Sequence, residues 1–253
     1  MTDKSQNPKN WFDQGGHNYA RFRPEYPPDL AAYLAEAAPR TTCCVDVGCG
    51  TGKLTVELAA HFDKVIGVDP SREQLAYAAR HDRVTYLRAD AEDIPIPPQT
   101  ADLITAAQAA HWFDRPAFYA EARRLAAPGA VIALISYGVM RFDDDALNAR
   151  FLRFYRDEIG LYWPSERKLV DSGYADIEFP FDEFSAPAMH IERDWTLAEF
   201  LGYLSTWSAV RKALEAERGD LLAAFAGDIS AAWNGGERTH RVTWPVTMRI
   251  GRI

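Results

Sequence analysis

Three glycines and an aspartate within residues 46–52 form the stretch of this chain best suited to hold a ligand. They follow a short apolar run in the order Asp46-Val47-Gly48-Cys49-Gly50-Thr51-Gly52. Glycines let the backbone turn tightly and approach a ligand without an intervening side chain. A helix that begins near Lys53 would point its free N–H groups at the same place. The stretch therefore predicts a small-molecule site at the carboxyl end of a strand.

Two further acidic residues stand where neighbouring strands should end. Asp69 follows the apolar run 64–68, and Asp90 follows the run 84–88. The carboxyl ends of parallel strands meet at one edge of a sheet, so we expect both side chains near the glycine turn. A carboxylate after the second strand can accept both hydroxyl hydrogens of a ribose diol. The ligand is therefore expected to resemble a nucleotide.

The spacing of the glycines helps to choose between two classes of nucleotide-like ligand. A nicotinamide or flavin dinucleotide requires G-x-G-x-x-G, because its pyrophosphate lies on the helix N-terminus. This chain has G-x-G-x-G at positions 48, 50 and 52, and Lys53 stands where the third dinucleotide glycine would be. The spacing disfavours a nicotinamide-dependent oxidoreductase, although the glycines and Asp69 alone leave that class as an alternative.

Short apolar runs and helical patterns alternate between residues 43 and 136. Strands are predicted at 43–47, 64–68, 84–88, 101–107 and 130–136, and helices from about 53, at about 71–80 and at about 116–128. Ser71-x-x-Gln74 is a capping box, Asp114 is a plausible helix cap, and Thr196-x-x-Glu199 caps a later helix. Repeated β/α units in this order imply a parallel sheet with right-handed crossovers and helices on both faces.

The regular alternation ends after Tyr137. Beyond it, the pattern predicts helices at about 143–159, 196–214 and 217–233, an extended stretch within 176–193 and a strand at 240–252. A short helix is also predicted before the first strand, at 29–38. We predict a doubly wound α/β fold with a mostly parallel, seven-stranded sheet, an antiparallel last strand and an inserted helical lid. The expected parts of this single structural domain are an aromatic arm and helix (1–39), a ligand-binding core (40–137) and the remaining strands with the lid (138–253).

Composition narrows the classes of partner. The chain has 253 residues and a net charge of −8, and its pI is near 5.3. We therefore expect no nucleic-acid or membrane partner, since both favour a basic surface. No apolar run reaches 18 residues, and three cysteines give neither a disulfide framework nor a metal quartet. The expectation is a cytoplasmic protein with reduced thiols, no metal and a small-molecule partner. The oligomeric state is left open.

Taken together, the Asp46–Gly52 turn, Asp69 and the segment Ala89–Pro95 resemble the class I S-adenosylmethionine-dependent methyltransferases. Segments Tyr19–Pro27 and Gln108–Asp114 are similar to the trans-aconitate subgroup, within the branch that also contains the ubiquinone/menaquinone-biosynthesis methyltransferases. The core resemblance covers about residues 40–136, and it is patchier elsewhere. It implies a Rossmann-like methyltransferase fold, with S-adenosylmethionine as cofactor and S-adenosylhomocysteine as product.

The resemblance also implies which residues contact the cofactor. They are Asp46, Gly48, Gly50, Gly52, Asp69, Asp90, Ala91 and Gln108. Tyr19 and Arg23, in the segment similar to the trans-aconitate subgroup, are also assigned to the cofactor. The glycine turn would lie against the methionine moiety, with Asp46 near its amino end. Asp69 would hold the ribose hydroxyls, and Asp90 would accept from the adenine amino group. The Ala91 backbone N–H would bind an adenine ring nitrogen, and Gln108 would line the methionine side.

His111 is the best-placed residue for the acceptor chemistry, because it follows the fourth strand at the mouth of the sheet. It could act as a base or position the acceptor, and a purely structural histidine is an equal alternative. Trp112 and Phe113 could shape the acceptor pocket or face the sulfonium, since aromatic rings attract cations. Arg21 is assigned to the acceptor. Arg21 and Arg23 could each bind the carboxylate of the cofactor or of a substrate by paired hydrogen bonds, and exposure to solvent is the alternative for both.

The chemistry implied by the resemblance is methyl transfer to a small molecule. The sulfonium methyl is already activated, so the protein must mainly align the acceptor and exclude water. The aromatic segment 11–27 is expected to cover the site as a flap or to act as a packing arm. We rank O-methylation first, with a carboxylate acceptor suggested by the subgroup and the arginines. The alternatives are a C-methyltransferase of the quinone-biosynthesis type, the oxidoreductase, and a non-catalytic cofactor-binding module.

Overall fold

The computed structural model describes residues 22–235 and 237–253. Within them, one sheet runs in the order β3-β2-β1-β4-β5-β9-β6, and β7 and β8 also pair with β9. β1 to β5 are parallel, whereas β9 is antiparallel to each of its partners. The strands are β1 Cys43–Val47, β2 Lys64–Val68, β3 Val84–Leu87, β4 Ala101–Ala107, β5 Ala126–Tyr137, β6 Arg141–Phe142, β7 Asp182–Phe184, β8 Met189–Trp195 and β9 His240–Arg252.

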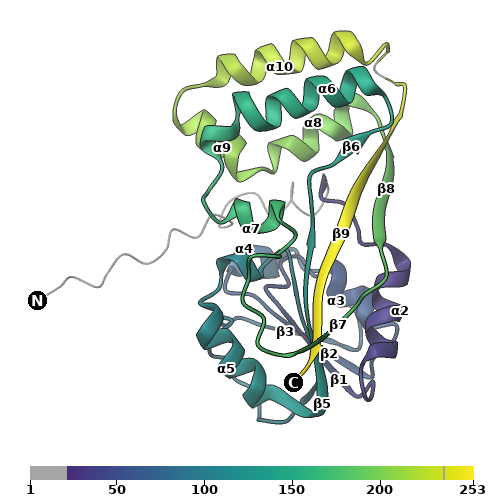
Figure 1. Ribbon diagram of the computed structural model, residues 1–253, viewed down its shortest axis with the longest axis vertical. Coiled ribbons are helices and arrows are strands. Elements are labelled where there is room, and N and C mark those ends of the chain that lie inside the picture. The colour runs from purple at the N-terminus through teal and green to yellow at the C-terminus, as the bar shows by residue number, and fades with distance from the viewer. Residues whose placement is uncertain (1–21, 236) are drawn as a thin grey trace, which may run out of the picture.

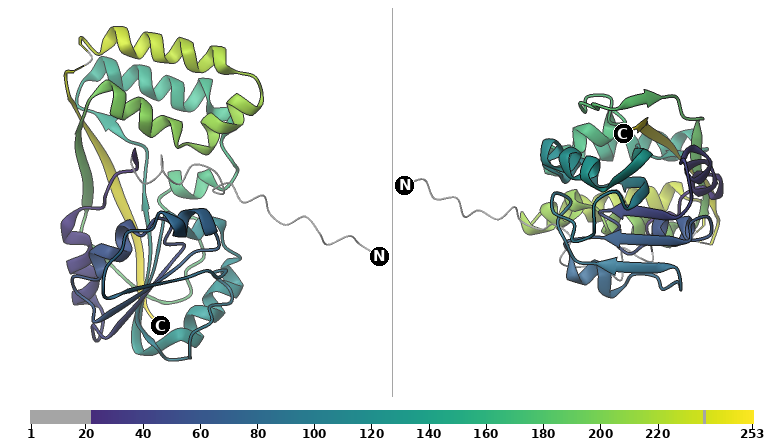
Figure 2. Two further views of the ribbon diagram at one scale, coloured as in Figure 1. Left: turned by 180° about the vertical axis from the view of Figure 1, so that it is seen from behind. Right: turned by 90° about the horizontal axis from the view of Figure 1, so that it is seen from below.

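The helices fall into two groups. Some cover the two faces of the parallel strands, and others gather at one end of the molecule as a cap (Figure 1). The first group is α2 Pro28–Ala37, α3 Lys53–Leu58, α4 Arg72–Ala76 and α5 Arg115–Leu125. The cap helices are α6 Asp145–Arg153, α8 Leu197–Ser205, α9 Ser208–Glu215 and α10 Gly219–Ala232. The short helix α7, Arg167–Asp171, lies between the cap and the sheet, as Figure 2 also shows from behind.

The central strands are buried on both faces, which explains their unbroken apolar sequences. Every residue of β1 is buried. Successive side chains of a strand point to opposite faces, so Cys44 belongs to the core cluster that contains α2 and α3, whereas Val45 belongs to the cluster that contains α5. The predicted α/β fold with a mostly parallel sheet and an antiparallel last strand is confirmed.

β9 connects the sheet to the cap. Residues 246–252 of β9 pair with β5, and residues 240–246 pair with β8. On the cap side, Phe142 lies 5.1–5.9 Å from the rings of Phe151, Phe200 and Trp233. One continuous strand and this aromatic cluster therefore join the cap to the sheet.

Several predicted elements differ from the structure. The sheet has nine strands rather than seven, because β6 and β7 are short strands paired to β9. The predicted helix 196–214 is two helices, since Trp207 adopts an extended backbone with ψ 138° and packs 5.0 Å from Trp163. The predicted helix 143–159 is α6 followed by a π-helical turn over Phe154–Glu158. Tertiary packing overrides local helix propensity at these positions.

Smaller differences concern where elements begin and end. α4 ends at Ala76 rather than near residue 80, and β5 begins at Ala126 rather than at 130. The predicted caps are present, because the side chains of Ser71, Asp114 and Thr196 each accept a backbone N–H. Among the described helices, none has both the length and the apolar character needed to cross a membrane.

A buried carboxylate holds the start of β1 against β4. Asp102 is 2% exposed, and its Oδ2 accepts the backbone N–H groups of Thr42 and Cys43 at 3.0 and 3.1 Å. Its Oδ1 accepts from Arg40 Nε at 3.1 Å. This contact fixes the strand that leads into the glycine turn.

We expect Asp102→Ala to lower the free energy of unfolding by about 2–4 kcal/mol, because it removes the acceptor of a buried N–H and of Arg40. Urea denaturation of the purified variant measures the change. Asp102→Asn keeps a side-chain oxygen and should lose less. An unchanged denaturation midpoint for the alanine variant would show that the contact does not stabilise the fold.

Candidate functional site

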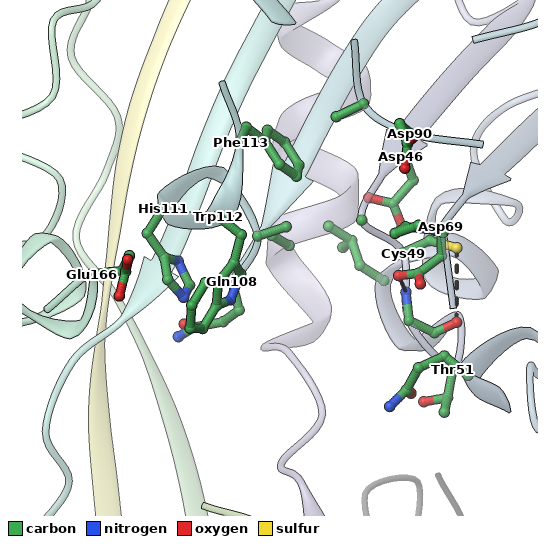
Figure 3. Close-up of a pocket in the computed structure, with 18 of the residues that line it drawn as sticks. Asp46, Cys49, Thr51, Asp69, Asp90, Gln108, His111, Trp112, Phe113 and Glu166 are labelled. Atoms are coloured by element: carbon green, nitrogen blue, oxygen red, sulfur yellow. Dashed lines mark hydrogen bonds between the residues drawn. The ribbon is translucent and has the colours of Figure 1, made fainter. Parts of the chain in front are cut away.

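A cavity of about 1720 Å³ opens at the carboxyl edge of the parallel strands. Its lining includes the predicted residues Arg23, Asp46, Gly48, Gly50, Asp69, Asp90, Ala91, Gln108, His111, Trp112 and Phe113. Figure 3 shows the three aspartates on one side, and Gln108, His111 and Trp112 on the other. The volume exceeds that of a typical single-ligand pocket, which suits a cofactor beside an acceptor.

The glycine turn is tightly confined by its neighbours. Gly48 and Gly52 have φ angles of 70° and 78°, a region that favours glycine. A Cβ at Gly48 would lie 2.4 Å from the Cβ of Ala109, and one at Gly52 would lie 2.0 Å from the Tyr86 hydroxyl. Gly52 does not line the cavity but is the N-cap of α3. The third glycine is therefore required by packing against β3.

Asp69 links the end of β2 to the glycine turn. Its Oδ2 accepts the Gly50 N–H at 2.8 Å, and its Oδ1 accepts the Ser71 N–H at 2.8 Å. Each carboxylate oxygen has a second lone pair, and the residue lines the cavity. Asp69 can therefore shape the turn and also accept hydroxyl hydrogens from a ribose.

Asp46 lies beneath the turn with 1% of its surface exposed. Its Oδ2 accepts the Thr55 hydroxyl at 2.6 Å, and its Oδ1 accepts the Thr105 hydroxyl at 2.8 Å. Burial raises the pKa of Asp46 to about 6, although the two hydroxyl hydrogen bonds oppose the change. Asp46 therefore joins β1 to α3 and β4 and can supply a buried negative charge near a bound cation.

The loop after β3 brings Asp90 and Ala91 to the cavity. This loop is held from α5, because the Ile94 N–H donates to Glu121 Oε1 at 2.8 Å and Arg124 donates to the Ile94 carbonyl at 2.8 Å. The charges of Glu121 and Arg124 also form an ion pair at 2.6 Å. Sequence reasoning missed this brace, although the opposite charges three residues apart on a predicted helix were its signal.

Gln108 has a left-handed backbone with φ 54°. Its N–H donates to the Ile135 carbonyl at 2.8 Å, and its Nε2 donates to the Tyr137 carbonyl at 2.9 Å. Such conformations cost about 1–3 kcal/mol and concentrate at functional sites. The residue is therefore held firmly between the ends of β4 and β5.

His111 is buried on the turn that follows β4. Its Nδ1 lies 2.9 Å from the hydroxyl of Tyr174. Burial, together with the smaller effects of the Arg167, Arg23 and Arg115 charges, lowers the pKa of His111 to about 3. A histidine with this pKa is neutral near pH 7 and a poor general base. The surroundings therefore disfavour the base role considered for His111 and leave acceptor positioning as the functional alternative.

The aromatic residues beside His111 both line the cavity and pack. The Trp112 ring lies 4.8 Å from the His111 ring, and the Phe113 ring lies 4.8 Å from Phe118. Tyr174, which sequence reasoning missed, has φ 64° and is fully buried. It stands shortly after α7, and no local sequence signal connected it with His111.

Arg23 lies where the cap meets the sheet. Its Nη1 donates to the Tyr137 hydroxyl at 3.2 Å, and its Nη2 donates to the Thr206 carbonyl at 3.3 Å. The predicted site residues Tyr19 and Arg21, and most of the aromatic segment 11–27, lie outside the described residues. Their predicted roles stay predictions.

The hydrogen-bond acceptors that line the cavity fit the cofactor predicted from the sequence. S-adenosylmethionine offers a ribose diol, an adenine amino group and an ammonium, each of which requires a hydrogen-bond acceptor. The structure brings Asp69, Asp90 and Asp46 to one side of the cavity. Three acceptors at the carboxyl edge of one sheet agree with this requirement.

Known proteins with similar sequences and structures identify the family. A family model described as a methyltransferase domain matches residues 45–134. A Dictyostelium discoideum protein named as a methyltransferase is 32% identical over 261 residues, which cover 100% of this chain and 99% of that protein. The chain belongs to the class I S-adenosylmethionine-dependent methyltransferases. This assignment replaces the oxidoreductase and the non-catalytic module considered from the sequence.

Two further methyltransferases support the assignment. A solved structure from Anaeromyxobacter dehalogenans, described as a type II methyltransferase, is 46% identical with a TM-score of 0.84, covering 91% of this chain and 98% of that chain. A Saccharomyces cerevisiae protein named as an S-adenosylmethionine-dependent methyltransferase is 27% identical over 226 residues, covering 76% of this chain and 78% of that protein. The trans-aconitate or quinone-biosynthesis branch stays a prediction.

Alanine substitutions of two aspartates test the cofactor contacts. We expect Asp69→Ala and Asp90→Ala each to weaken S-adenosylmethionine binding by about 1–3 kcal/mol, the cost of losing hydrogen bonds to a carboxylate. Calorimetric titration measures this loss. Asp90 makes no side-chain hydrogen bond in the described part of the chain, so only Asp69→Ala should also lower the melting temperature. Unchanged affinity in both variants would contradict the proposed contacts.

The raised pKa of Asp46 predicts opposite pH trends for binding and stability. The cationic cofactor favours the ionised carboxylate, so its affinity should rise between about pH 5 and pH 7 and then level off. The contribution of Asp46 to the stability of the unliganded protein, measured as the difference from Asp46→Asn, should fall as pH rises through about 6, because the native pKa exceeds the ordinary value of 3.8. Titrations and melting curves of both proteins at several pH values measure the two trends. Asp46→Asn should also flatten the pH dependence of binding.

Proposed function

We propose that this methyltransferase methylates a carboxylate oxygen of a small molecule. The observation that carries the proposal is the positive charge around the neutral His111. Arg23 comes from the segment before α2, Arg115 from the start of α5 and Arg167 from α7, and all three lower the pKa of His111. Arginines that converge from separate elements favour an anionic acceptor.

The arginines can be divided between the two ligands. We assign Arg23 to the carboxylate of the cofactor, which leaves Arg115 to contact the acceptor. Arg115 lines the cavity, and it forms no ion pair with any residue that the structure describes. Arg167 is fixed by hydrogen bonds from its Nε to Asp171 Oδ1 and the Tyr155 hydroxyl, both at 2.9 Å.

A carboxylate acceptor agrees with the absence of a strong base at His111. S-adenosylmethionine supplies the activated methyl group, which forms an ester with a carboxylate oxygen and leaves S-adenosylhomocysteine. A carboxylate is already deprotonated, so the site needs only to bind and orient it. Neutral His111 can contribute a hydrogen bond from Nε2 when the Tyr174 hydroxyl donates to Nδ1.

The low pKa of His111 makes a carbon acceptor less suitable. Methylation at carbon requires a stabilised carbanion, and a histidine with a pKa of about 3 is poorly suited to form one. The cationic surroundings also attract an acid before they attract a neutral phenol or alcohol. Ester formation further removes the negative charge, which weakens the contact with the arginines and assists product release.

Labelled cofactor tests this proposal. The protein is incubated with methyl-labelled S-adenosylmethionine and a panel of small mono-, di- and tricarboxylic acids. We expect label to enter an acid and to be released by esterase or mild alkali, as a methyl ester requires. Label that resists hydrolysis would place the methyl group on another atom and overturn the carboxylate assignment.

Arg115→Gln tests the acceptor contact with the acid that the panel identifies. We expect its KM to rise about tenfold, because a charge-assisted hydrogen bond is lost, while cofactor affinity is unchanged. Arg123→Gln on the same helix is the control, since Arg123 lies 4.7 Å from the Phe181 ring and outside the cavity lining. Equal KM values in both variants would exclude Arg115 from the acceptor site.

A further inference from the structure

Gly202 lies inside α8 of the cap, where its missing side chain makes room for Phe22. A Cβ at this position would lie 2.4 Å from Cε1 and 2.5 Å from Cδ1 of the Phe22 ring. Glycine within a helix costs about 0.5–1 kcal/mol relative to alanine. The close approach of Phe22 supplies a packing reason for this unfavourable residue.

The residue after Phe22 contacts the end of the same helix. Arg23 donates to the carbonyl of Thr206, the C-cap of α8. Its guanidinium carbon also lies 5.4 Å from the centre of the Tyr203 ring. Free carbonyl groups and the helix dipole favour a cation at a helix C-terminus. α8 therefore holds Phe22 at its middle and Arg23 at its end.

These two contacts act on a residue of the cavity. Arg23 lines the cavity, and it also reaches the Tyr137 hydroxyl at the end of β5. The packing of the Phe22 ring against Gly202 restricts the position of the backbone at the adjacent Arg23. A Cβ at Gly202 would displace the Phe22 ring, and the adjacent Arg23 would move with it.

We propose that Gly202 is a positioning residue for the methyltransferase reaction. It seats Phe22 and thereby holds Arg23 in place to bind the carboxylate of the cofactor. This inference rests on the cofactor contact proposed above for Arg23. It assigns the cap a role in cofactor binding, through a residue that does not line the cavity itself.

The test compares two ligands that differ in the amino-acid moiety. S-adenosylhomocysteine carries the carboxylate, whereas 5′-methylthioadenosine lacks the whole amino-acid portion. We expect Gly202→Ala to weaken S-adenosylhomocysteine about tenfold in calorimetric titration, as expected for a misplaced charge-assisted hydrogen bond, and Arg23→Gln to do the same. Binding of 5′-methylthioadenosine should change in neither variant.

Two controls separate positioning from a general effect on the cap. Gly227→Ala in α10 adds a Cβ that meets no atom within 4 Å, so it should leave both ligands unaffected. Alanine favours the helix, so Gly202→Ala should keep a melting temperature close to that of the wild type. The Phe22→Ala and Gly202→Ala double variant should bind S-adenosylhomocysteine no more weakly than either single variant, because both remove one coupled contact.

The outcomes distinguish this inference from the proposed cofactor contact. If Arg23→Gln weakens S-adenosylhomocysteine and Gly202→Ala does not, the role of Gly202 is overturned while the Arg23 contact stands. If Gly202→Ala weakens both ligands equally, its effect is structural and the inference also fails. No change in Arg23→Gln would reject the Arg23 contact, and no binding by the wild type would reject the cofactor site as a whole.

Discussion

The buried carboxylate of Asp46 is the contact on which the binding edge depends. It accepts one hydroxyl from α3 and one from β4, so a single side chain joins the strand before the glycine turn to both neighbouring elements. Asp69 then fixes the middle of the turn through the Gly50 N–H. Burial of Asp46 raises its pKa to about 6, which couples the geometry of the turn to protonation. A bound cation would offset part of this cost by favouring the ionised form.

The opposite end of the cavity is organised by different forces. His111 is held by Tyr174, which follows α7 in the chain, and Gln108 is held between β4 and β5. Both Gln108 and Tyr174 have left-handed backbones that non-glycine residues rarely adopt. Arginine charges at this end lower the pKa of His111, and the acid Glu166 also lines the cavity beside it. The three aspartates lie where the cofactor cation is expected, and we assign the arginine charges to an anionic acceptor.

The cap contributes to the cavity from a distance. β9 and the aromatic cluster around Phe142 join it to the sheet, and residues 22 and 23 lie against α8. The N-terminal end of the described chain thus lies between α8 and the cavity that Arg23 lines. This arrangement gives the cap a physical route to the bound ligands that the parallel core alone would not provide.

The sequence by itself determined the features that depend on neighbouring residues. The glycine turn, the aspartate after β2, the strand pattern of β1–β5 and the capping residues Ser71 and Thr196 were predictable, because strand burial, turn geometry and helix capping leave local patterns. Only the tertiary structure decided the break between α8 and α9, the low pKa of His111 and the seat of Phe22 on Gly202. These features arise from rings and charges that are distant in the chain, and their energies depend on burial and separation in space. Patterns of neighbouring residues in the sequence do not specify these distances in space.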